Sequence, residues 1–153
     1  MKLATFPITT EAIISFEDSN DRRLVLLFKT FNPSNSEEWQ LPTTDLRNGE
    51  TALDAVQRMV REKVNLNIDK GHFDFLNMYD DPSRIRDGKR VVSVTYFHFL
   101  EDVTSILTAK SNFLIKKKGW FDVDNLPVMA FDHGKIIREF IEQQYPLHYS
   151  FDK

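Results

Sequence analysis

The chain has 153 residues, a formal net charge of −3 and no cysteine, which excludes a disulfide scaffold, a cysteine-based metal site and general polyanion binding. A content of 41% hydrophobic and 28% charged residues is typical of a globular protein and not of a disordered one. No apolar run reaches the length of a signal peptide or a membrane span, so we expect one cytoplasmic domain over residues 1–153 without a membrane contact.

The first half of the chain predicts two strands followed by a helix. Apolar runs at 12–16 and 24–28 flank a short polar stretch, which is the pattern of two strands joined by a turn. Residues 52–64 repeat apolar side chains every three or four positions, which predicts a helix. Thr51 and Asp54 have the spacing of a capping box at its start, with Asp in place of the usual Glu.

The second half predicts further strands and a second helix. Residues 73–79 alternate as a strand does, 91–100 are rich in β-formers, and 119–123 are expected to form a short strand. The polar stretch 80–90 is predicted to be a loop. Asp132 is a good N-cap residue for the final helix. The pattern indicates an α/β (α+β) fold in which a mixed sheet lies between helical layers.

The region of the first helix carries a motif that resembles the Nudix hydrolases. The resemblance rests on Trp39-Gln40-Leu41-Pro42, on Gly49-Glu50 and on the helix at 52–64. Thr44 takes the place of the signature's first glycine and Asn65 that of its closing glycine. The resemblance implies the Nudix fold.

Two later segments extend the resemblance over most of the chain, from about Thr10 to Tyr145. They are similar to ADP-ribose-type Nudix proteins, most of all to the ADP-ribose-sensing domain of bacterial Nudix-related transcriptional regulators. The first is Asp81-Pro82-Ser83-Arg84 before Val91-Val92-Ser93-Val94-Thr95-Tyr96, and the second is residues 120–127 followed by Ala130-Phe131-Asp132-His133.

The metal-binding part of the motif is degenerate in this chain. Carboxylates at positions i, i+3 and i+4 of a helix project together and offer the hard oxygen ligands that Mg²⁺ prefers. Here these positions carry Met59, Glu62 and Lys63, of which Met is a soft ligand and Lys a cation. We therefore expect no firm metal site, with Glu62 as its one remaining ligand, and little or no hydrolysis.

The retained and altered residues of the motif have alternative roles. Glu50 and Arg58 are interpreted as a pair that braces the loop against the helix. Glu62 is either a relic catalytic acid or a lone surface acid. We hypothesise that the ammonium of Lys63 replaces the lost metal and pairs with Glu62 or with the pyrophosphate of a ligand.

Candidate ligand-binding residues come from the second half of the chain. The resemblance places Arg84 near a ligand's phosphates or second ribose, although Ile85 replaces the acid that usually follows, and an exposed loop cation is the alternative. Arg86 is a nearby basic substitute. Tyr79 is a candidate for stacking on an adenine ring. His133 is a candidate ligand contact by resemblance, with a structural role as the alternative.

Three functions follow from these residues. The first is a sensor of an ADP-ribose-like nucleotide diphosphate, without a firm cofactor. The second is an active Nudix pyrophosphohydrolase that uses Mg²⁺ and acids outside the motif, for which the candidates are Asp80, Asp81, Asp87 and Glu101. The third is a structural or dimerisation module without nucleotide affinity.

The resemblance also suggests partners. Family members often form homodimers, and we carry this over as an expectation. The regulators have a DNA-binding winged helix after the Nudix domain, whereas this chain ends about twenty residues beyond Asp132. DNA binding is therefore expected only through a C-terminal domain that this chain lacks.

Overall fold

The computed structural model describes residues 2–30, 37–101 and 115–146. Within these ranges the chain forms strands, two α-helices and one 3-10 helix. In order they are β1 (Ile8–Glu17), β2 (Arg23–Thr30), β3 (Trp39–Gln40), β4 (Thr43–Asp45), α1 (Ala52–Val64), η1 (Lys70–His72), β5 (Asp74–Tyr79), β6 (Ile85–Arg86), β7 (Lys89–Arg90), β8 (Val92–Leu100), β9 (Ile115–Asp122) and α3 (His133–Gln144).

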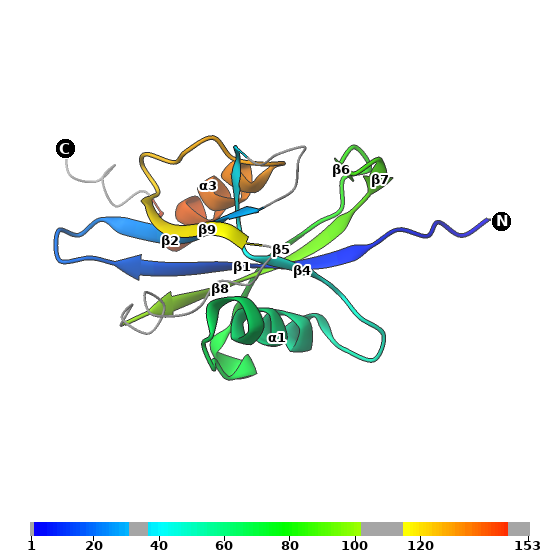
Figure 1. Ribbon diagram of the computed structural model, residues 1–153, viewed down its shortest axis with the longest axis horizontal. Coiled ribbons are helices and arrows are strands. Elements are labelled where there is room, and N and C mark those ends of the chain that lie inside the picture. The colour runs from blue at the N-terminus through cyan, green and yellow to red at the C-terminus, as the bar shows by residue number, and fades with distance from the viewer. Residues whose placement is uncertain (1, 31–36, 102–114, 147–153) are drawn as a thin grey trace.

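The strands form a mixed, seven-stranded sheet with β1 at its centre (Figure 1). The order is β3-β2-β1-β8-β5, while β4 pairs with β1 and β9 with β2. β1 and β8 run parallel from Ile8 opposite Val92 to Phe16 opposite Leu100. The other named pairs of this sheet are antiparallel. The prediction of a mixed sheet with two helices is confirmed.

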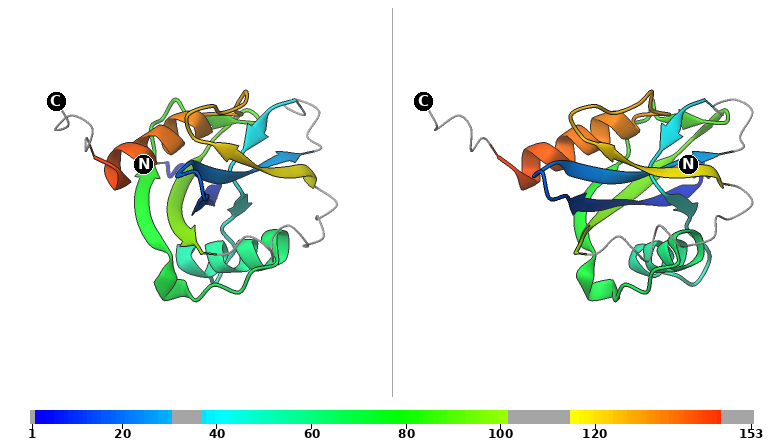
Figure 2. Two further views of the ribbon diagram at one scale, coloured as in Figure 1. Left: turned by 90° about the vertical axis from the view of Figure 1, so that its left-hand side faces the viewer. Right: turned by 60° about the vertical axis from the view of Figure 1, so that its left-hand side comes forward.

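The two α-helices cover opposite faces of the sheet, with α1 below it and α3 above it in Figure 1, and the views in Figure 2 show the same layers. Because successive side chains of a strand point to opposite faces, β1 contributes to both cores. Ala12 and Ile14 pack with α1, whereas Ile13 packs with Ile136 and Phe140 of α3. Among the described residues, neither α-helix has the length and apolar character needed to cross a membrane.

Local signals determine the bounds of α1. The helix runs from Ala52 to Val64, as the periodicity predicts, and the capping box is formed by both reciprocal bonds between Thr51 and Asp54. Asn65 ends the helix with φ 61° and ψ 39°, the left-handed conformation that Asn and Gly tolerate.

The structure corrects two predicted boundaries. The stretch 80–90 is not a plain loop, because β6 and β7 form a hairpin within it. Asp87 and Gly88 have φ values of 51° and 77° at its turn, and Asp-Gly is a favoured sequence for such hairpin turns. The predicted short strand at 119–123 is part of the longer β9, which pairs with β2 along most of its length.

We expect Asn65→Ala to lower the free energy of unfolding by roughly 1 kcal/mol, because alanine disfavours the left-handed conformation, whereas Asn65→Gly should leave it unchanged or raise it. Urea denaturation of the two variants measures this order. Asn67→Ala, at an exposed position with ordinary backbone angles, is the matched control. Equal stability of Asn65→Ala and wild type would contradict the claim that the left-handed conformation at residue 65 disfavours alanine.

Candidate ligand site

Arg58 joins the loop before α1 and strand β4 to the helix. Its Nε and Nη2 donate to the two carboxylate oxygens of Glu50 at 3.0 and 2.7 Å, and Nη2 also donates to the carbonyl of Asp45 at 3.0 Å. The hydrogen bond from Arg58 lowers the pKa of Glu50 to about 2, so this carboxylate is ionised near neutral pH. This geometry braces the loop against the helix.

The three motif positions on α1 point to different surroundings. Met59 is fully buried in the core, and Glu62 is exposed, with an ion pair to Arg58 at 3.6 Å. The ammonium of Lys63 donates to the carbonyl of Thr43 at 2.5 Å. Lys63 therefore bonds to the backbone of β4 and does not pair with Glu62, in contrast to one of the alternatives predicted from the sequence.

The surroundings of Lys63 do not fit a divalent cation. Burial is the main cause that lowers the pKa of Lys63, and the positive charge of Arg58 adds to it. A thioether in the core and an ammonium on the nearby carbonyl offer none of the hard oxygen ligands that Mg²⁺ requires. In the part of the chain that the structure describes, no group of three or more His, Asp or Glu side chains is arranged to hold a metal ion.

A cavity of about 570 Å³ opens between the end of β5, the β6–β7 hairpin and the start of α3. Its size is within the range of small-molecule sites in proteins. Arg84, Tyr79 and Arg86 all line it, together with Asp81 and Glu139. Three elements that are distant in sequence therefore meet at one concave surface.

Arg84 is a mostly buried side chain that connects the elements around this cavity, so the alternative of an exposed loop cation is wrong. Its side chain is 9% exposed, and Nε and Nη2 donate to both carboxylate oxygens of Asp132 at 2.7 and 3.0 Å. Its Nη1 donates to the carbonyls of Tyr79 and Val91. Asp132 occupies the N-cap position of α3, yet its side chain makes no capping bond, because the carboxylate pairs with Arg84.

Tyr79 fixes the other side of the cavity. Its hydroxyl donates to Glu139 of α3 at 2.8 Å, and Asn77 donates to the same carboxylate at 2.9 Å. Burial, together with Glu139 as acceptor, raises the pKa of Tyr79, so the phenol stays protonated. The ring is half-buried, and stacking of Tyr79 on an adenine stays a prediction.

His133 is fully buried and is not among the residues that line the cavity, so its place fits the structural alternative and not a ligand contact. Its Nδ1 accepts a hydrogen bond from the backbone N–H of Leu41 at 2.9 Å. The other ring nitrogen, Nε2, lies 3.4 Å from a carboxylate oxygen of Glu11.

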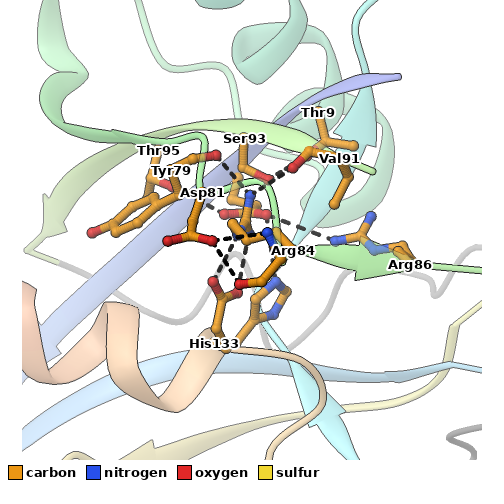
Figure 3. Close-up of polar contacts among 12 residues, drawn as sticks. Thr9, Tyr79, Asp81, Arg84, Arg86, Val91, Ser93, Thr95 and His133 are labelled. Atoms are coloured by element: carbon orange, nitrogen blue, oxygen red, sulfur yellow. Dashed lines mark hydrogen bonds and ion pairs between the residues drawn. The ribbon is translucent and has the colours of Figure 1, made fainter. Parts of the chain in front are cut away.

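Glu11 is a buried carboxylate that the sequence analysis missed. It is 0% exposed, accepts a hydrogen bond from Thr95 at 2.9 Å and lies 3.8 Å from Nη2 of Arg86. Burial alone would raise the pKa of Glu11, but His133 and the hydrogen bonds of Ser93 and Thr95 lower it to about 2. Figure 3 shows Ser93, Thr95, Arg86 and His133, which surround this carboxylate.

Arg86 connects this buried network to the cavity. Its guanidinium carbon lies 4.4 Å from the ring centroid of Phe131, an arrangement typical of a cation–π contact. Its Nε is buried and has no hydrogen-bond partner among the residues that the structure describes. Arg86, which lines the cavity, therefore retains an unused donor, whereas each guanidinium nitrogen of Arg84 already donates a hydrogen bond.

Comparison with known proteins identifies the family. The NUDIX domain matches residues 9–144. The ADP-ribose pyrophosphatase of Methanocaldococcus jannaschii is 32% identical over 121 residues, which cover 79% of this chain and 67% of that protein. The chain therefore belongs to the Nudix family, as the motif predicts.

Solved structures share the fold. A MutT/nudix family protein from Enterococcus faecalis has a TM-score of 0.76 at 21% identity, over 94% of this chain and 64% of that one. The NUDIX domain of Shewanella oneidensis NrtR, in a complex with ADP ribose, has a TM-score of 0.73 at 19% identity, over 93% and 90%. The Nudix fold predicted from the sequence is thus confirmed.

The bracing pair generates a pH-dependent prediction. The pKa of Glu50 is lowered in the folded state from an ordinary value of 4.5, so its stabilising effect is present above pH 4.5 and is lost as the pH falls towards 2. Glu50→Gln should therefore unfold at lower urea concentration than wild type at pH 7, and the difference should shrink below pH 4.5. Glu142→Gln, at an exposed site on α3, is the control. A difference that does not change with pH would contradict this assignment.

Proposed function

We propose that this Nudix domain binds an ADP-ribose-like nucleotide diphosphate as a sensor, with little or no hydrolysis. The observation that carries the proposal is the ammonium of Lys63, which lies on the carbonyl of Thr43 where the motif would otherwise contribute a carboxylate. Met59, at a second motif position, is fully buried in the core. The chain thus has a cation where the family motif is expected to contribute a metal ligand.

The chemistry of hydrolysis explains why these changes favour binding. Cleavage of a pyrophosphate needs divalent cations that neutralise phosphate charge and activate water. An ammonium supplies positive charge but cannot activate water in this way. The positive charge of Lys63 would therefore attract a diphosphate but would not cleave it.

The cavity has the volume of a small-molecule site, and Lys63 is not among the residues that line it. Arg86 lines the cavity and supplies its own positive charge there. The Methanocaldococcus jannaschii relative is an ADP-ribose pyrophosphatase, and the Shewanella oneidensis domain was solved in a complex with ADP ribose. These observations support ADP-ribose as the first ligand to test.

An active Nudix pyrophosphohydrolase is the alternative, and one observation favours it. Asp80 and Asp81, two of the acids outside the motif, line the cavity. Asp87 lies in the hairpin turn and Glu101 follows β8, and neither lines the cavity. This alternative requires Mg²⁺ and release of AMP from ADP-ribose.

A regulatory role extends the sensor proposal. Shewanella oneidensis NrtR has also been solved with a 27mer DNA. By analogy, this domain would act as the ligand-sensing part of a cytoplasmic homodimeric regulator, and a separate segment would contact DNA. Size-exclusion chromatography with light scattering tests the homodimer.

Charge reversal at Lys63 tests the proposal directly. Lys63→Glu should weaken binding of ADP-ribose in the presence of a chelator by at least about tenfold, or roughly 1.4 kcal/mol, because a cation near the diphosphate becomes an anion. Arg61→Glu changes the net charge equally at an exposed position of the same helix and should have little effect. Isothermal titration calorimetry measures both. Unchanged affinity of Lys63→Glu would refute the role of this ammonium.

A further inference from the structure

The turn that leads from β4 into α1 (Figure 1) contains the only Asn-Gly sequence of the chain, Asn48-Gly49. Both residues are exposed, and a bond from the backbone N–H of Glu50 to the carbonyl of Arg47 at 3.3 Å closes the turn around them. Gly49 has φ 85°, a conformation that glycine adopts without strain. Neither residue lines the cavity beside α3, so the chemistry of this turn is separate from the ligand site.

The amide nitrogen of Gly49 is an accessible group beside the carboxamide of Asn48. In the described part of the chain, neither the backbone N–H of Gly49 nor the carboxamide of Asn48 makes a hydrogen bond. Glycine has no side chain to shield its amide, and no atom from beyond its chain neighbours lies within 4 Å of the place where a Cβ would be. Both groups are therefore free to approach each other.

These two groups can react with each other and with water. When the amide of Gly49 loses its proton to hydroxide, its nitrogen attacks Cγ of Asn48. The new N–Cγ bond closes a succinimide ring, and the carboxamide nitrogen leaves as ammonia. Water then opens the ring at one of its two C–N bonds. Opening at Cγ gives aspartate, whereas opening at the backbone carbonyl gives isoaspartate, in which the main chain runs through Cβ and Cγ and is one carbon longer.

The lengthened turn would lie among the bonds that hold the loop on α1. The carboxylate of Glu50 accepts from the backbone N–H of Arg47 at 2.9 Å and from Arg58 at 2.7 and 3.0 Å, so the same group closes the turn and braces it against the helix. An extra backbone carbon between Arg47 and Glu50 changes the spacing that these bonds require. The new carboxylate also adds negative charge close to Glu50.

We propose that Asn48 is a site of spontaneous deamidation and that its isoaspartate form weakens the brace between Glu50 and Arg58. The reacting groups belong to this chain and the remaining reactant is water, so no cofactor or enzyme is required. The inference does not rest on the proposed nucleotide binding. The loop before α1 therefore changes with the age of the protein.

Peptide mass spectrometry of wild type, incubated for days in mildly alkaline buffer, tests the site. The peptide that contains Asn48 should gain the mass difference between water and ammonia and should split into two chromatographic peaks, one for each product. Asn67 and Asn125 are exposed too, but Ile68 and Leu126 follow them and shield the amide nitrogen. These internal controls should convert at least about tenfold more slowly, a difference of about 1.4 kcal/mol in the activation barrier. No product at Asn48, or equal conversion at the three asparagines, would overturn the proposal.

Thermal melts of fresh and aged protein test the effect on the brace. Aged wild type should melt roughly 2–4 °C lower, the shift expected in a domain of this size when about one hydrogen bond is lost. Asn48→Gln, which cannot form the succinimide, should melt equally before and after ageing. Asn48→Asp carries the charge without the longer backbone and should lose less stability than the aged protein.

A double-variant comparison links the effect to the brace. In Glu50→Gln the brace is already weakened, so ageing should lower the melting temperature less than it does in wild type. An equal shift in Glu50→Gln and wild type would overturn the link between Asn48 and the brace. The absence of a shift in wild type that mass spectrometry shows to be converted would overturn it as well.

Discussion

The buried charge of Glu11 is the constraint that connects the sheet, α3 and the cavity. An ionised carboxylate in a protein interior is costly unless it is paired and hydrogen-bonded. Thr95 of the neighbouring parallel strand donates to it, His133 lies beside it, and Arg86 supplies positive charge. These partners come from β8, α3 and β6, so the same carboxylate fixes the start of the helix and the position of the cationic side of the cavity.

The hydrogen bond from Leu41 to His133 extends this constraint towards α1. Leu41 lies between β3 and β4, directly before the strand whose carbonyl receives the ammonium of Lys63. The motif helix and α3 cover opposite faces of the sheet, and they are linked through this backbone segment. The ammonium of Lys63 thus lies on a strand next to the scaffold that Arg58 and Glu50 brace.

Short-range signals allowed prediction of much of the fold. The bounds of α1 follow from periodicity and from a capping box whose two partners, Thr51 and Asp54, are three positions apart, so all their determinants lie within the helix and its flanks. The hairpin at Asp87 and Gly88 was missed because its strands have only two residues each and no apolar alternation. Its turn sequence was nevertheless a usable signal.

The site was harder to predict because its contacts join distant parts of the chain. Arg84 and Asp132 were each recognised, but their pairing across 48 positions was not, and it decides that Arg84 organises the cavity. Glu11 was missed since its partner Thr95 lies 84 positions away. The position of Glu11 directly before the apolar residues Ala12, Ile13 and Ile14 could have indicated a buried carboxylate. The partners of this carboxylate, however, become visible only in the folded structure.

Titration of the wild-type protein with ADP-ribose in chelator, with AMP release assayed in the same samples and again with Mg²⁺, tests the central claim most directly. The account predicts micromolar binding without metal and no AMP in either buffer. Release of AMP that depends on Mg²⁺ would contradict it and would show that the chain cleaves the ligand with acids outside the motif.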